Sequence, residues 1–201
     1  MIGIIDYGAG NLHSVAKALK FLGYQTHLVT KNSDLKEVNK LILPGVGAFG
    51  QAVADLRAKG LWPALNNWVR QGLPLLGVCL GMQLLMESSQ ESPGIGGLGF
   101  IKGTCDRLRA PKVPHMGWNE VHFLDSIPLF DGLQDGSCFY FVHSYYVSPE
   151  DSKVVRGSTE YNLVFPSVIQ VGRVLGVQFH PEKSGEQGLL FLRNWVEKCC
   201  E

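Results

Sequence analysis

The sequence predicts an α/β fold, in which helices flank an open, mostly parallel central sheet and a β-rich insertion occupies the second half. Two observations support this prediction. Up to about residue 88, strand and helix patterns alternate, as they do in the βαβ units of parallel sheets. After Ser88 helical patterns largely disappear, and short strand patterns follow. A chain of 201 residues is long enough to bury its own core, so we expect one domain over residues 1–201.

The first βαβ unit begins with an apolar strand over residues 2–5. A helix is predicted over residues 12–22, where apolar side chains recur at helical spacing, and a second strand over residues 25–29. Gly8 and Gly10 invite comparison with a dinucleotide-binding fingerprint. The third glycine of that motif is missing, however, and no acidic residue ends the second strand. We therefore expect no cofactor.

A third strand over residues 40–43 leads into a glycine-rich turn and then a helix over residues 48–59. Backbone amides with little side-chain cover, at the end of a strand and the start of a helix, can donate hydrogen bonds to an oxyanion. An ordinary strand-to-helix turn is the alternative interpretation. The candidate oxyanion donors are Gly45, Val46 and Gly47.

The next strand, over residues 73–78, ends at Cys79, and a helical pattern follows immediately. Gly77 and Gly81 flank this cysteine in a Gly-x-Cys-x-Gly pattern, which with serine forms the nucleophile elbow of hydrolases. The partial positive charge at a helix start would favour the thiolate. A buried core cysteine is the competing interpretation.

The second half contains strand patterns separated by loops, of which residues 91–99 form the first. Residues 113–119 resemble an exposed turn that displays a Met and a Trp, as a partner surface would; a small apolar cluster under a loop is the alternative. An aromatic-rich strand is predicted over residues 138–143. Residues 153–158 and 163–171 suggest a hairpin.

His180 and Glu182 provide a candidate base and a carboxylate to orient it. In extended chain, residues two apart point to the same side, so both side chains can face one target. His115 and His143 are alternative bases, although neither has an acid two residues later. A closing helix is predicted from Gly185.

These residues can supply the parts that thiol catalysis needs. Cys79 would be the nucleophile, His180 the base, Glu182 its orienting group, and the amides of Gly45 to Gly47 the oxyanion donors.

Composition argues against several other functions. The chain has 18 basic residues (Lys and Arg) and 18 acidic residues (Asp and Glu). This balance gives no excess of positive charge to bind the phosphates of a nucleic acid. The absence of a basic leader and of a long apolar run favours a soluble, cytoplasmic protein that does not bind membranes. Five scattered cysteines without CxxC spacing do not suggest a disulfide framework or a metal site.

Three ordered motifs resemble the class I, or triad, glutamine amidotransferases over essentially the whole chain: Leu43-Pro-Gly45, Gly77-Val-Cys-Leu-Gly-Met-Gln83 and Val177-Gln-Phe-His-Pro-Glu182. The resemblance implies a flavodoxin-like three-layer fold. It also implies hydrolysis of glutamine to glutamate and ammonia through a glutamyl thioester on Cys79, with His180 and Glu182 completing the triad.

Four further segments narrow the resemblance: residues 6–11, 44–49, 114–119 and 143–145. They are similar to family members that form a heterodimer with a cyclase (β/α)8-barrel subunit in histidine biosynthesis. The partner adds the ammonia to a phosphoribosyl aminoimidazole intermediate. By this similarity the glutamine pocket comprises Gly47, Gln83, His143, Ser144 and Tyr145, and the partner interface Asn11, Met116, Trp118 and Lys183. Gln83 lies one helical turn past Cys79, which independently supports its place in the glutamine pocket.

Three alternatives remain open from the sequence. The chain could serve another ammonia-channelling synthase, such as that of pyridoxal phosphate synthesis, although its Pro44-Gly-Val-Gly-Ala turn differs from the Pro-Gly-Gly-Glu-Ser of that group. It could be a catalytically silent scaffold subunit, or a thiol hydrolase acting on peptides or esters.

Overall fold

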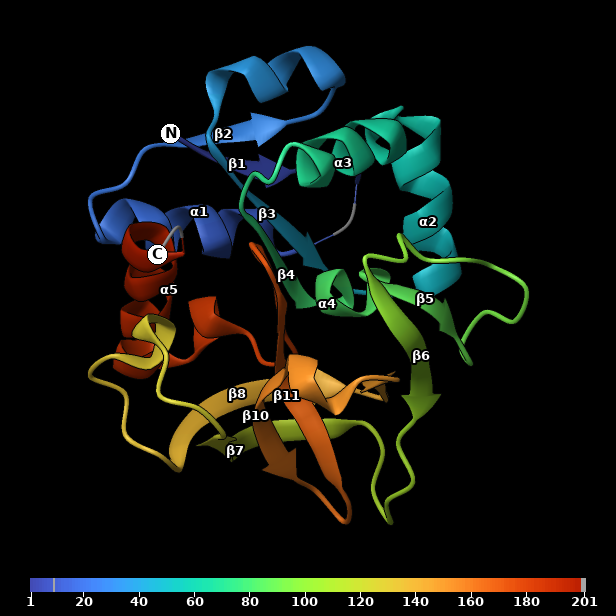
Figure 1. Cartoon of the computed structure of the whole chain (residues 1–201), viewed down its shortest axis with the longest axis vertical. Helices are drawn as coiled ribbons and strands as arrows, with labels where there is room; N and C mark the ends of the chain where they lie inside the picture. Colours follow the sequence, from blue (N-terminus) through green and yellow to red (C-terminus); the bar gives the residue numbers. More distant parts are fainter. Residues whose placement is uncertain (9, 200–201) are drawn as a thin grey trace.

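The fold is organised around a nine-stranded sheet with the strand order β2-β1-β3-β4-β12-β11-β10-β7-β8 (Figure 1). The computed structural model describes residues 1–8 and 10–199. Five neighbouring strands run parallel and form one half of the sheet. They are β2 (Thr26–Val29), β1 (Ile2–Ile5), β3 (Lys40–Gly45), β4 (Leu75–Cys79) and β12 (Val174–Val177). Apart from Leu28 on the edge strand β2, their Leu, Ile and Val side chains are buried, because helices cover both faces.

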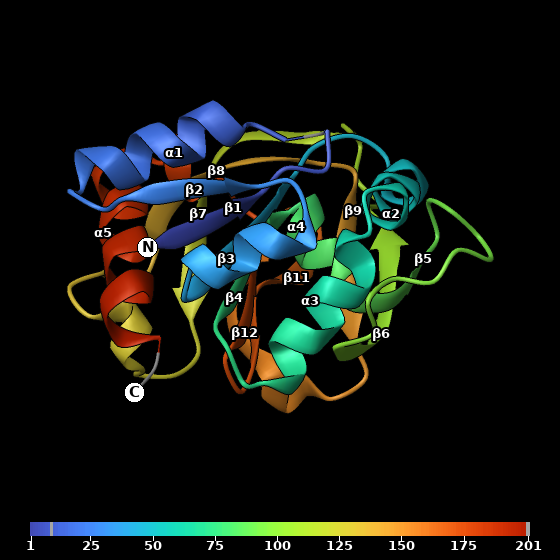
Figure 2. The same cartoon turned by 90° about the horizontal axis from the view of Figure 1, so that it is seen from above.

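The helices lie in two layers, one on each side of the parallel strands (Figure 2). On one side α1 (Leu12–Phe21) and α5 (Gly185–Lys198) share an apolar core with the sheet. On the other side α2 (Phe49–Ala58) and α3 (Leu61–Arg70) enclose a second core. This arrangement confirms the predicted three layers, and the helix bounds agree closely with the apolar periodicity. None of the helices in the described part of the chain is both long and apolar enough to cross a bilayer.

The other half of the sheet is antiparallel and comes from the β-rich insertion between β4 and β12, as predicted. Its strands are β11 (Val164–Val171), β10 (Val155–Glu160), β7 (His115–Phe123) and β8 (Ser137–His143). A separate three-stranded sheet consists of β5 (Met86–Ser89), β6 (Ile101–Arg107) and β9 (Tyr145–Pro149). Short 3-10 helices complete the chain: η1 (Asn32–Glu37), η2 (Pro128–Phe130), η3 (Ser152–Val154) and η4 (Pro181–Lys183). The expected β10–β11 hairpin is present.

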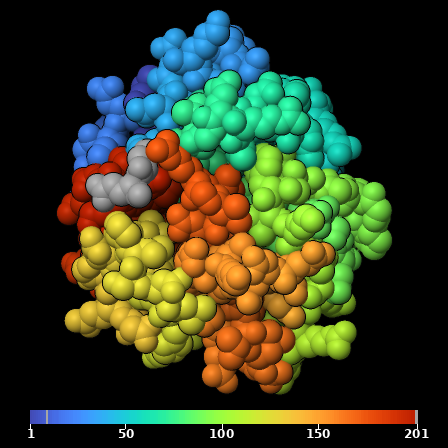
Figure 3. Space-filling model, viewed as in Figure 1, coloured from blue at the N-terminus to red at the C-terminus, as the bar shows by residue number. Residues whose placement is uncertain are grey.

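Strands β4 and β12 lie side by side although the whole insertion separates them in the sequence. The two strands are parallel, with Val78 opposite Val177, so both strands end at the same edge of the sheet. The first and last parts of the chain also meet, because α1 contacts α5; the blue and red segments adjoin in the space-filling view (Figure 3). Because β4 and β12 are parallel neighbours, the residues that follow β4 lie next to those that follow β12.

The segment at residues 113–119 differs from its prediction as an exposed turn. It enters strand β7 at His115, and residues 115–119 all pair with β8. Side chains therefore alternate between the two faces: His115 is only 2% exposed, whereas Met116 and Trp118 are 60% and 58% exposed. The alternation was not recognised in the sequence because Gly117 interrupts it and polar and apolar residues are mixed in this segment.

Candidate active site

Cys79 lies at the end of β4 in a backbone conformation that side chains rarely adopt, with φ 55° and ψ −109°. The flanking glycines make the turn possible. A Cβ at Gly77 would lie 2.6 Å from the carbonyl oxygen of Gly81, and a Cβ at Gly81 would overlap the carbonyl oxygen of Leu43. Strain of this kind at a strand-to-helix junction is the geometry of a nucleophile elbow.

The helix predicted after Cys79 is present but short. Helix α4 (Leu80–Leu84) has five residues, because the chain turns into β5 at Met86. So short a helix sums few peptide dipoles, which makes its contribution to thiolate stability smaller than expected. The sulfur instead has two long polar contacts, to the carbonyl oxygen of Val142 and to Nε2 of Gln178, each at 3.7 Å.

His180 and Glu182 form a buried pair. Nδ1 of His180 lies 2.8 Å from Oε1 of Glu182, and the two side chains are 2% and 1% exposed. The predicted reason for this contact is wrong: β12 ends at Val177, and Pro181 starts the 3-10 turn η4 rather than continuing an extended chain. The fixed φ of proline favours such a turn, which still brings the i and i+2 side chains together.

The backbone around His180 is held by β8. The N–H of His180 donates to the carbonyl oxygen of Tyr140 at 2.9 Å. The hydroxyl of Ser184 donates to the carbonyl oxygen of His180 at 2.6 Å and accepts the N–H of Tyr140 at 3.0 Å. These contacts fix the imidazole beside the elbow.

The charge of His180 follows from its neighbours. Burial on its own would lower its pKa, but the interactions of the ring with Cys79 and Glu182 outweigh burial and raise the pKa to about 10. Among the described residues, no group lies in hydrogen-bonding geometry with its Nε2. At neutral pH the ring is thus an imidazolium with a proton available on the Cys79 side of the site, an arrangement that supports thiol chemistry.

A cavity of about 300 Å³ opens onto Cys79. Its walls come from the β3–α2 turn, the elbow, the loop after β5, and the junction between β8 and β9. The lining residues are Val46, Gly47, Cys79, Leu80, Gln83, Glu91, Pro114, Val142, His143, Ser144 and Tyr145. Every residue of the predicted glutamine pocket is among them. Of the predicted oxyanion turn, Val46 and Gly47 line the cavity, while Gly45 is buried in β3 opposite Cys79.

Buried amides connect the cavity wall to the cysteine. Nε2 of Gln83 donates to the carbonyl oxygen of Tyr145 at 2.8 Å and to Oε1 of Gln178 at 3.3 Å. Gln178 completes the link to Cys79, yet sequence reasoning gave it no role. Its position two residues before His180 was the available signal, because alternate residues face one side of an extended segment.

Glu91 is a second residue that sequence reasoning missed, because it falls in a loop. Its Oε2 accepts the backbone N–H of Phe49 at 2.7 Å, which fixes it near the start of α2. Among the described residues that line the cavity it is the one carboxylate. A group with a positive charge would be favoured beside it.

His115 and His143, the alternative bases, contact each other instead of a carboxylate. Nδ1 of His115 lies 2.9 Å from Nε2 of His143. Burial lowers the pKa of His115 to about 4. Burial also lowers the pKa of His143 to about 3, against the opposing hydrogen bond to the carbonyl oxygen of Tyr145. Both rings are therefore neutral at pH 7. Of the three candidate bases His115, His143 and His180, the one that contacts a carboxylate is His180.

Three of the residues expected at a partner interface lie on β7 and η4: Met116 and Trp118 on the strand and Lys183 on the 3-10 turn. The ring of Tyr140 lies between two of them, 6.1 Å from the ring of Trp118 and 5.8 Å from Nζ of Lys183. Met116 shares the exposed face of β7 with Trp118. Asn11 precedes α1, which packs against η4.

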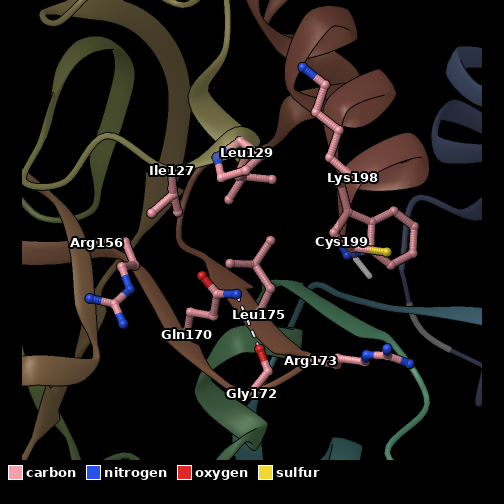
Figure 4. Close-up of a pocket in the computed structure, with 11 residues that line it drawn as sticks. Ile127, Leu129, Arg156, Gln170, Gly172, Arg173, Leu175, Lys198 and Cys199 are labelled. Atoms are coloured by element: carbon pink, nitrogen blue, oxygen red, sulfur yellow. Dashed lines mark hydrogen bonds between the residues drawn. The ribbon is translucent and has the colours of Figure 1, made fainter. Parts of the chain in front are cut away.

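A larger cavity, of about 530 Å³, lies at the opposite end of the sheet, near the start of β12 (Figure 4). Arg156, Arg173 and Lys198 reach its edge, and the side chain of Gln170 donates to the carbonyl oxygen of Gly172. The described residues that line it include no histidine that could act as a base. Within the described residues, no group of three or more His, Cys, Asp or Glu is placed to hold a metal. The cavity at Cys79 is thus the candidate active site.

Comparison with known proteins assigns the family. A family model described as "Glutamine amidotransferase class-I" matches residues 3–199 of this chain. The chain belongs to the class-I glutamine amidotransferases. Within this family it is 50% identical, over 98% of its length and 94% of the relative, to "Imidazole glycerol phosphate synthase subunit HisH" of Moorella thermoacetica. It is 49% identical to the protein of the same name from Methanocaldococcus jannaschii, over 98% of this chain and 99% of that relative.

Solved structures agree on the amidotransferase fold. A crystal structure of a glutamine amidotransferase superimposes with a TM-score of 0.77 at 23% identity, covering 97% of this chain and 98% of that one. The structure of PurLQS from Thermotoga maritima gives a TM-score of 0.78 at 18% identity, over 97% and 96% of the two chains. At these identities the likeness concerns the fold alone.

Proposed function

We propose that the chain is the glutaminase subunit of an imidazole glycerol phosphate synthase, which hydrolyses glutamine to glutamate and ammonia for histidine biosynthesis. One observation carries the chemical part of the proposal: β4 and β12 are adjacent and parallel, so that Cys79 and the buried His180–Glu182 pair meet beside a cavity of about 300 Å³. The relatives that share half of the sequence support the pathway.

In the proposed reaction the Cys79 thiolate attacks the side-chain carbonyl carbon of glutamine. The imidazolium of His180 gives its Nε2 proton to the departing nitrogen, which leaves as ammonia, and a glutamyl thioester remains. The now neutral His180 then takes a proton from water, whose oxygen attacks the thioester and releases glutamate. Glu182 holds the ring by its Nδ1 throughout and stabilises the charged form.

The cavity residues have matching roles in this proposal. Amides of the turn that contains Gly45, Val46 and Gly47 would donate to the oxyanion, while Gln83, His143, Ser144 and Tyr145 position the substrate. The carboxylate of Glu91 suits the α-ammonium group of glutamine.

The proposed partner is a cyclase (β/α)8-barrel subunit that receives the ammonia along a sheltered path. Ammonia is protonated in neutral water and loses its nucleophilicity, so direct transfer is chemically favourable. The surface that includes Met116, Trp118 and Lys183 suits the interface, because large exposed aromatic and apolar groups gather there beside a cation. Asn11 would lie at its edge. In this proposal residues 1–201 act as one domain in a cytoplasmic heterodimer, without a cofactor, nucleic acid or membrane.

The test measures glutamate and ammonia release with and without the barrel subunit. The wild-type complex should hydrolyse glutamine, whereas C79A should lose at least about 10³-fold in kcat. Cys138, which is exposed on β8, offers the matched control, and C138A should keep full activity. Glutamine turnover that survives in C79A would rule out the mechanism. Turnover of peptides or esters in preference to glutamine would favour a different thiol hydrolase.

A further inference from the structure

His115 and His143, which transfer no proton in the proposed reaction, form a buried chain of hydrogen bonds. Nδ1 of His143 lies 2.9 Å from the carbonyl oxygen of Tyr145, and its Nε2 lies 2.9 Å from Nδ1 of His115. Nε2 of His115 lies 3.2 Å from the side-chain nitrogen of Asn119. The rings are 5% and 2% exposed, so solvent cannot replace these partners.

The chemistry of the partners fixes the direction of every bond in this chain. A carbonyl oxygen can only accept, so Nδ1 of His143 carries the proton. In a neutral ring Nε2 of His143 must then accept, and Nδ1 of His115 must donate to it. Nε2 of His115 is left to accept the N–H of Asn119.

The amide of Asn119 is oriented independently of the histidines. Its nitrogen donates to the carbonyl oxygen of Glu160 at 2.9 Å, and its oxygen accepts the N–H of Glu120 at 2.8 Å. A flipped amide would lose both contacts. The proton order is therefore imposed from the backbone at both ends of the chain.

The surroundings keep both rings neutral. His115 stacks between Phe141 and Tyr161, with ring centroids 4.9 and 4.1 Å away. Burial holds the pKa of His115 near 4. Burial, with smaller contributions from the charges of His115 and His180, brings the pKa of His143 to about 3. An extra proton on either ring would break the order, since two donors would then face each other.

The chain of bonds ends at the wall of the cavity. Ser144 alone joins β8 of the large sheet to β9 of the small one, and both it and Tyr145 line the cavity at Cys79. The carbonyl oxygen of Tyr145 accepts from His143 and also from Gln83. The position of this junction thus depends on the His143 tautomer that donates from Nδ1.

We infer that His115 is a positioning residue: it donates from Nδ1 to His143, holds that ring in the Nδ1–H tautomer, and thereby fixes the Ser144–Tyr145 wall of the substrate cavity. The kinetic consequence rests on the proposed glutaminase function. The tautomer assignment does not, which allows the two to be tested separately.

Long-range 1H–15N spectra of the histidine rings test the tautomers directly on the full chain at pH 7. Wild type should show Nδ1–H for both rings, although free neutral imidazole side chains favour Nε2–H. H115F keeps the aromatic stack but removes the donor, so the His143 signal should move to a tautomer mixture. H115N, whose side-chain N–H lies near the place of Nδ1, should restore it. An Nε2–H tautomer of His143 in wild type would overturn the inference.

Kinetics of the complex with the barrel subunit supply the functional part. H115F should raise KM for glutamine about 10-fold and change kcat less than about 3-fold, while H115N should recover most of the loss. The alkylation rate of Cys79 should stay within about twofold, because His180 and Glu182 are untouched. Unchanged KM in folded H115F would overturn the positioning role. A wild-type complex without glutaminase activity would overturn only the proposed function.

A gentler variant guards against a folding failure of H115F. N119A removes the donor to Nε2 of His115 from a partly exposed strand position. It should partly mix the tautomers of both rings and raise KM about threefold. If N119A leaves the ring spectra and KM as in wild type, the chain of bonds does not position the wall.

Discussion

His180 and His143 lie close to the same cavity, yet their surroundings leave the first ring positively charged and the second neutral at pH 7. Both are buried, which disfavours the charged ring in each case. His180 meets the carboxylate of Glu182 and the sulfur of Cys79, which raise its pKa to about 10. His143 meets a carbonyl oxygen and a neutral imidazole, and its pKa falls to about 3. The charge of the partner, more than the degree of burial, separates the two regions.

This difference assigns different tasks to two residues of one type. A ring that can carry and release a proton suits acid–base chemistry, and a ring that stays neutral suits positioning. The positive charge of His180 itself helps to keep His143 neutral. The two regions are thus electrostatically coupled, and exchange of their roles would need a carboxylate beside His143.

The largest expected effect comes from removing each ring in turn. H180N should lower kcat for glutamine hydrolysis by roughly 10³-fold or more, because both proton transfers lose their carrier. H143N should act mainly on KM, since it loosens the wall at Tyr145 and leaves His180 and Glu182 in place. Steady-state kinetics of the complex separate the two. Equal losses of kcat in both variants would break the comparison.

A smaller effect is expected on the other face of β7, the strand that carries His115. W118A should weaken association with the barrel subunit about 10- to 30-fold, because a large exposed ring beside Tyr140 suits an interface anchor. The histidine ring spectra of the isolated chain should not change. L124A is a matched control, since Leu124 is 56% exposed just beyond the same strand. Titration calorimetry measures the affinities, and an equal loss in both variants would contradict the interface.

The smallest effect is a difference in how stability depends on pH. The pKa of folded His180, about 10, exceeds the unfolded value, so its stabilisation is full below about pH 6.5 and is lost as pH rises towards 10. His115 has a folded pKa of about 4, so its neutral ring favours folding fully above about pH 6.5 and stability falls as pH drops towards 4.

Urea unfolding at pH 5, 7 and 9.5 measures both changes. H180Q should flatten the alkaline decline and H115F the acidic one, each by about 1 to 2 kcal/mol. Opposite assignments, with H180Q acting at acid pH, would reverse the comparison between the two regions.

The sequence by itself determined the features that depend on local spacing. Helical periodicity indicated the bounds of α1 and α2 and the start of α5, and βαβ order indicated parallel strands. The glycines around Cys79 predicted a sharp turn, since the sterics that require them arise within a few residues and at the neighbouring strand. The acid two residues after His180 identified the pair, although Pro181 makes the contact through a 3-10 turn.

The tertiary structure alone decided which distant residues meet. No local pattern reports that β12 pairs with β4 after a long insertion, because strand pairing is set by the packing of the whole sheet. The same cause hid β7, whose alternation becomes meaningful only beside β8, and the roles of Gln178 and Glu91. Cys200 lies outside the described residues. The positive charge of His180 and the neutrality of His143 likewise depend on partners from other parts of the chain, which only the folded structure brings together.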